Sequence, residues 1–190
     1  MKKIVVLILA CIFSQGISAD IGEALSALKK KQNVNIKFHA RELNDSFDTE
    51  HPIGDHTISL TPYAFDLNDN KYLSIHLNTD KLWGTKIYEG LSVKTNESYG
   101  PCYRFDDTNS QSFNSFIISV CSSGEALPVL RITKNGKQRQ FICGWFSVIG
   151  ADGRELIPHT IFSGNAEGNN ILIQLLDFLY STYPKSQYVR

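Results

Sequence analysis

The strongest constraint on the fold is a run of three β-type segments separated by two glycine turns. The dipeptide "NG" at 135–136 separates "LPVLRITK" from "KQRQFIC", and "DG" at 152–153 separates "FSVIGA" from "RELIPHTIF". Both dipeptides suit the type I′ turns of antiparallel hairpins. The pattern therefore predicts a three-stranded meander with a middle strand over 137–149 that bends near Gly144. Pro158 is expected to keep the third strand at an edge or a bulge.

Two-residue periodicity extends over much of the remaining chain. "YAFDLND" and "KYLSIHL" alternate apolar and polar residues around the turn "NDN", which predicts another hairpin. Helical spacing occurs only near the ends, in "DIGEALSALKKK" and in "NNILIQLLDFLYS", where Asn169 or Asn170 can cap the helix. The sequence therefore predicts a mainly β fold. We expect an antiparallel β-sandwich or open barrel with a short N-terminal helix and a C-terminal amphipathic helix packed on it.

The first 19 residues have the layout of a signal peptide. Two lysines precede a short apolar run, and small residues precede Asp20. The apolar run is much shorter than the roughly 20 residues that a membrane-spanning helix requires. We therefore expect a signal peptide over 1–19, a single β-rich domain over 20–190, and no membrane span after signal removal. The mature protein would be secreted, or periplasmic if the source is bacterial.

Composition supports one globular domain and argues against nucleic acid as a partner. The chain is 42% hydrophobic and 20% charged, which is sufficient for a core. Removing Lys2 and Lys3 with the signal leaves 17 basic against 19 acidic residues, a net charge of −2. Nucleic-acid-binding domains usually carry a basic surface instead.

Export also sets the expected chemistry of the cysteines. Cys102 and Cys121 are 19 positions apart and lack the neighbouring ligands typical of zinc sites, so a disulfide is favoured over a metal pair. Closing that loop would stabilise the fold by about 3 kcal/mol in the chain-entropy model. Cys143 is left as a free thiol, which is either buried, paired to another chain or kept for a function. Asn44 and Asn96 are glycosylation acceptors if the source is eukaryotic.

Known catalytic motifs are absent from the sequence. It contains no GxSxG, HExxH, GxGxxG or Walker loop. Cys143 and His159 could form a nucleophile and base, but no family-type signature surrounds either residue. "HPIGDH" places His51, Asp55 and His56 close together, and a polar loop explains this segment better than a metal site does, because its proline and glycine exclude an aligning helix. We therefore expect no enzyme activity, no bound metal and no cofactor.

Several of these features occur in the order found in one protein family. "FDLNDNKYLSIHLNTDKLWG", the "CY" at 102–103, "IISVCSSG" at 117–124 and the following apolar strand resemble the propeptide of reprolysin-type zinc metalloproteases, the ADAM, ADAMTS and snake-venom enzymes. The resemblance covers roughly residues 58–143. The matching positions are Phe65, Leu67, Leu77, Leu82, Cys102, Tyr103, Ile118, Ser119, Cys121, Gly124 and Ile132.

The resemblance implies a secreted, non-catalytic domain that assists the folding of a zinc metalloprotease and keeps it latent. Such prodomains wrap the catalytic domain, and many direct a cysteine thiolate to its zinc; Cys143 would be the corresponding inhibitory thiol here. Two alternatives stay open. Cys143 can be a buried structural residue, and the chain can be a secreted or periplasmic β-domain that binds or inhibits another protein, such as an immunity-type factor.

Overall fold

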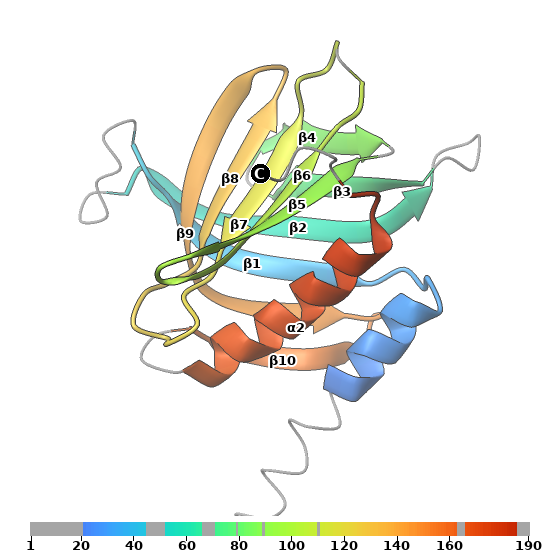
Figure 1. Ribbon diagram of the computed structural model, residues 1–190, viewed down its shortest axis with the longest axis vertical. Helices are drawn as coiled ribbons and strands as arrows, with labels where there is room; N and C mark the ends of the chain where they lie inside the picture. Colours follow the sequence, from blue (N-terminus) through green and yellow to red (C-terminus); the bar gives the residue numbers. More distant parts are fainter. Residues whose placement is uncertain are drawn as a thin grey trace, which may run out of the picture.

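One large antiparallel sheet makes up most of the molecule (Figure 1). The computed structural model describes residues 21–44, 52–65, 71–78, 80–88, 90–109, 111–162 and 166–185. The predicted signal peptide and His51 lie outside these residues. The strands are β1 (Asn35–Glu42), β2 (Gly54–Phe65), β3 (Lys71–Leu77), β4 (Asp80–Tyr88), β5 (Leu91–Glu97), β6 (Gly100–Asp106), β7 (Ser115–Ser119), β8 (Val129–Lys134), β9 (Lys137–Ile149) and β10 (Glu155–Ile161).

The strand order is β4-β3-β2-β1-β9-β8-β7-β6-β5, and β10 pairs with β9. Strand β9 is long enough to have β1 along one edge and first β8, then β10, along the other. The β1–β9 register shifts between His39 and Ala40, opposite Gly144, where a bend was predicted. The register of β10 shifts between Ile157 and Thr160, on either side of Pro158, as expected for a proline in an edge strand.

The sheet curls so that the β4 edge approaches the loops of its other half. The Asn114 side-chain amide donates to the Lys86 carbonyl at 3.1 Å, and the Thr108 hydroxyl donates to the Tyr88 carbonyl at 3.3 Å. The predicted fold class, a mainly β antiparallel architecture with one helix near each end, is therefore confirmed.

The two glycine turns differ. Asn135 and Gly136 have φ angles of 51° and 79°, so both central residues are left-handed as in the predicted type I′ turn. In the second turn only Gly153 has a positive φ, 81°, and the Gly150 amide donates to the Arg154 carbonyl around a longer loop. The prediction of a type I′ turn was therefore wrong for the second turn. Its closing hydrogen bond joins Gly150 to Arg154, so the loop is longer than the two-residue turn expected at Asp152-Gly153.

Both helices pack on the inner face of the sheet. The N-terminal helix covers residues 21–29, and α2 spans Ala166–Thr182. In Figure 1, α2 lies across the open side of the curled sheet between β5 and β10. The leucine-rich face predicted from the sequence is buried, namely Ile171, Leu172, Leu175, Leu176 and Leu179. The first turn of α2 meets β10 so closely that a Cβ atom on Gly168 would lie 2.8 Å from the Ile161 carbonyl oxygen.

Helix α2 begins earlier than predicted. It starts at Ala166, so Asn169 lies inside the helix and is fully buried rather than capping it. Its side-chain amide donates to the Cys121 carbonyl at 2.5 Å. The residue therefore ties the helix to the β7–β8 loop. Among the described residues, neither helix is both long and apolar enough to cross a membrane.

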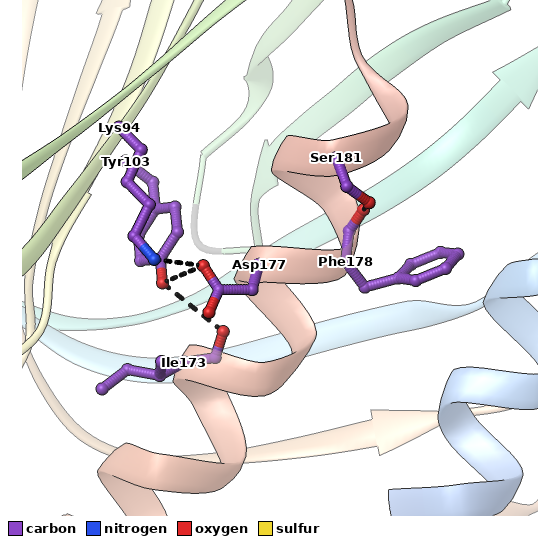
Figure 2. A network of polar contacts seen from close by, with 6 residues as sticks. All are labelled: Lys94, Tyr103, Ile173, Asp177, Phe178 and Ser181. Atoms are coloured by element: carbon purple, nitrogen blue, oxygen red, sulfur yellow. Dashed lines mark hydrogen bonds and ion pairs between the residues drawn. The ribbon is translucent and has the colours of Figure 1, made fainter.

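A polar network attaches the middle of α2 to β5 and β6 (Figure 2). The buried Tyr103 hydroxyl donates to an Asp177 carboxylate oxygen at 2.8 Å, and the Lys94 ammonium contacts the same oxygen at 2.5 Å. Burial, together with the neighbouring Asp177 carboxylate, raises the pKa of Tyr103 far above its usual value. The phenol therefore stays protonated and serves as a permanent hydrogen-bond donor.

Candidate functional site

The outer face of the sheet, which the helices do not cover, carries a group of histidine, tryptophan and charged side chains. Alternation along β1 buries Phe38 and Ala40 in the core and places His39 and Arg41 on the outer face. Strand β9 likewise buries Phe146, while Trp145 lies on the outer face beside His39, its cross-strand partner.

His39, Trp145 and His159 form a column of stacked rings across β1, β9 and β10. The ring centroids of His39 and Trp145 are 3.3 Å apart, and those of Trp145 and His159 are 3.9 Å apart, with interplanar angles of 12° in both pairs. We call these three residues the histidine column. Both faces of the indole are covered, so a ligand can reach Trp145 only at its edge.

A cavity of about 400 Å³ adjoins the histidine column. It is lined by His39, Ala40, Arg41, Asp55, His56, Thr57, Asn78, Gly144 and Trp145. The cross-strand partners Arg41 and Asp55 bring opposite charges to it, and both are exposed. The cavity thus combines charged and neutral hydrogen-bonding groups beside an aromatic wall, as in many binding sites.

The imidazole of His39 is the titratable group most affected by this environment. Burial lowers its pKa, and the nearby His159 and Lys37 lower it further by charge repulsion. The Thr57 hydroxyl lies 3.3 Å from Nδ1 of His39, and it is the only hydrogen-bond partner of that imidazole among the described residues. The Thr57 hydroxyl and the His39 imidazole are the types of group found in an acid–base pair, but 3.3 Å is longer than a good O–H···N hydrogen bond, so the contact is weak.

A second polar group lies on the inner face of the same strands. Arg139 donates two hydrogen bonds to the Glu42 carboxylate at 2.7 and 2.6 Å, and Nε2 of His56 lies 2.9 Å from it. The hydrogen bond from Arg139 lowers the pKa of Glu42. The Arg139 and His56 side chains both satisfy the Glu42 carboxylate within the fold, so the cluster ties β1, β2 and β9 together.

The predicted clusters of chemically active residues are separated by the fold. Asp55 faces outward while His56 contacts Glu42, and no group of three or more metal-binding side chains occurs within the described ranges. Cys143 belongs to the core, whereas His159 is exposed on the outer face, so these two do not form a nucleophile and base.

The three described cysteines are free thiols. Cys121 lies two positions beyond Ser119, the cross-strand partner of Cys102, so the two cysteines are diagonal neighbours on adjacent chain segments. Their thiols contact serine hydroxyls instead, and the hydrogen bond with Ser123 lowers the pKa of Cys121. Diagonal neighbours are farther apart than disulfide geometry requires, so a bond needs a local shift of the backbone. The Cys102–Cys121 disulfide stays a prediction.

The other predicted site residues differ in accessibility. Cys143 is completely buried, and this burial raises the pKa of its thiol well above the usual value. Its position favours the structural alternative over an inhibitory thiol. Asn96 is exposed at the end of β5, and Asn44 is half-buried at the end of the described range 21–44. Glycosylation at either asparagine stays a prediction.

Most of the residues around the cavity were not predicted from the sequence. The alternation in "NIKFHARE" could have placed His39 and Arg41 on a common polar face. Nothing local pairs that strand with Trp145, because their contact depends on the distant β1–β9 register.

No family model, curated protein or solved structure matches the chain. The resemblance to reprolysin-type propeptides therefore stays a prediction from the sequence.

Proposed function

We propose that this chain is an exported, non-catalytic binding protein whose outer face receives a protein partner at the histidine column and its cavity. The observation that carries the proposal is the convergence of Arg41, Asp55 and Asn78 on one cavity beside stacked aromatic rings. Such a site can pair with charged and polar side chains of a partner. Tryptophan and arginine are also the residue types that dominate binding energy in protein interfaces.

A zinc metalloprotease catalytic domain is the partner that the sequence resemblance suggests. Of the two inhibitory modes known from that family, surface wrapping suits this fold better than zinc ligation by a thiol. Cys143 could reach a zinc ion only if β9 left the sheet, and its raised pKa disfavours the thiolate that binds zinc. We therefore propose inhibition or folding assistance through the surface.

The test is inhibition of a reprolysin-type catalytic domain by the full secreted chain, measured with a peptide substrate. We expect Cys143→Ser to inhibit as well as the unmodified chain, and Asp55→Asn and Trp145→Ala to inhibit at least tenfold less. Ser59→Ala, on the outer face of β2 but not part of the cavity lining, is the matched control.

The outcomes separate the two parts of the proposal. Absence of inhibition and of binding by the unmodified chain would exclude the metalloprotease as partner. Equal inhibition by all variants would instead retain the partner and reject the site. Loss of inhibition in Cys143→Ser alone, in a folded protein, would restore the thiol mechanism.

Export is testable on the same product. Intact mass of the secreted protein, with and without alkylation, should show a start at Asp20. The Cys102–Cys121 disulfide predicts a mass lower by two hydrogens and one alkylatable cysteine after unfolding. A retained N-terminus would contradict export by a cleaved signal peptide, and three alkylatable cysteines would contradict the disulfide.

A further inference from the structure

A second cavity lies on the outer face of the other half of the sheet, across β5, β6, β7 and β8. Its volume is about 440 Å³. The strand registers place Val93, Arg104, Ile117 and Arg131 in one continuous row from β5 to β8. All four line the cavity, so Ile117 lies between the two arginines and Val93 lies beyond Arg104. We call this site the arginine cup.

Arg131 is the unusual residue of the arginine cup. Its Nε atom is buried and has no hydrogen-bond partner, and the described residues provide no ion-pair partner for its guanidinium group. Its cross-strand neighbours are Ile117 and Gln140, neither of which carries a negative charge. A buried donor without an acceptor is destabilising, so such a group requires an explanation.

Arg104 is only partly neutralised. Its Nε atom donates to both oxygens of Asp106 at 2.8 Å, and its terminal amino groups have no hydrogen-bond partner within the described part of the chain. Asp106 is therefore already bound to Arg104, and the lining has two positive charges and one negative charge. The cup can accept one more negative charge.

We infer that the arginine cup binds an oxyanion, a carboxylate or phosphate group, held between Arg131 and Arg104. Planar guanidinium groups bind both kinds of oxyanion through paired N–H donors. Arg104 and Arg131 stand two strands apart, roughly 10 Å between their strand axes, which lets two long side chains converge on one small group. Val93 and Ile117, the apolar residues of the lining, favour a carboxylate attached to an apolar group. This inference uses other residues than the histidine column and does not rest on the proposed function.

Proton–nitrogen NMR of the arginine Nε–H groups tests this inference directly in the full secreted chain. The resonance of Arg131, assigned from its loss in Arg131→Gln, is followed while sodium phosphate, acetate or butyrate replaces chloride at constant ionic strength. We expect a saturable shift with at least one anion. A phosphate-only response identifies a phosphate site, and several-fold tighter binding of butyrate than of acetate identifies an apolar carboxylate.

The variants separate a specific site from general charge effects. In Arg131→Gln the response of the Arg104 resonance should be lost, whereas Arg154→Gln, which removes an exposed arginine paired with Glu23, should leave it unchanged. The inference is overturned if Arg131 responds to none of the three anions, or shifts without saturation as the exposed arginines do. A response of Arg104 that persists in a folded Arg131→Gln protein also overturns it.

Discussion

The charged groups on the two faces of the sheet differ in how completely they are paired. On the inner face, Tyr103 donates to Asp177, and Glu42 accepts two bonds from Arg139. On the outer face, Arg131 has a buried donor without an acceptor. The inner-face charges are thus paired within the fold, although the Thr85 hydroxyl and Oδ1 of Asn169 are also buried without a partner among the described residues. The unpaired group on the outer face is different because it is cationic. The difference indicates where a partner or ligand would bind.

The pairing on the inner face has a physical reason. Burial removes water from these groups, so an unpaired charge there would be strongly destabilising. The outer face lies under no helix, so water can reach the exposed parts of its charged side chains and compensate part of the same loss. Unpaired groups are therefore tolerated on the outer face at a lower free-energy cost.

The largest expected effect contrasts two consecutive residues of β9. Phe146→Ala removes a fully buried ring and should lower the free energy of unfolding by about 3–5 kcal/mol. Trp145→Ala removes ring stacking on the outer face and should cost about 1–2 kcal/mol. Urea unfolding followed by circular dichroism measures both. Equal losses would mean that the histidine column belongs to the core.

The next contrast uses two arginines on neighbouring strands. Arg139→Met leaves the Glu42 carboxylate, whose side chain is 12% exposed, with only the His56 ring in contact with it among the described residues, and should cost about 2–3 kcal/mol. Arg131→Met removes an unpaired donor and should leave stability within about 0.5 kcal/mol, or raise it slightly. Urea midpoints at low anion concentration measure the difference. A large loss in Arg131→Met would show that this arginine has a structural partner.

A smaller effect is expected where α2 meets β6. Tyr103→Phe removes the hydroxyl that donates to Asp177 and should cost about 1–1.5 kcal/mol, because Asp177 is partly exposed and keeps its contact with Lys94. Tyr88→Phe on β4, whose hydroxyl makes no hydrogen bond to the described residues, is the matched control and should change stability by a few tenths of a kcal/mol. Thermal unfolding compares the two. Equal changes would show that the network does not stabilise the attachment of α2.

Local sequence patterns were sufficient for much of the fold. The turn at 135–136, the bend at Gly144 and the edge position of Pro158 depend on neighbouring residues and backbone sterics, and each was predicted correctly. The start of α2 was wrong because Asn169 has a long-range partner, the Cys121 carbonyl, that competes with a capping role.

Both outer sites depend on strand pairing, which local patterns do not encode. His39 meets Trp145 through the β1–β9 register, and Arg104 meets Arg131 through two successive pairings. A two-residue period indicates which residues share a face, but it cannot identify the neighbouring strand or its register. The sequence could therefore supply the candidate residues without bringing them together.

The smallest predicted effect is the contribution of the histidine column to the pH dependence of stability. The pKa of His39 is lower in the folded protein than the value of 6.5 expected when unfolded, so the unfolded chain binds more protons as pH falls. The stability linked to this residue is complete above about pH 6.5 and is lost as pH falls through the lowered folded pKa. His39→Gln should therefore lose less stability than the unmodified chain between pH 7.5 and 5, measured by thermal unfolding.

An NMR titration of the His39 ring checks the cause of this pH dependence. The midpoint of the titration should lie below 6.5 and should move upward in His159→Gln, where charge repulsion is removed. A midpoint at or above 6.5 would mean that water reaches the His39 ring as freely as it reaches an ordinary surface histidine. The contrast between the two faces of the sheet would then depend on Arg131 alone.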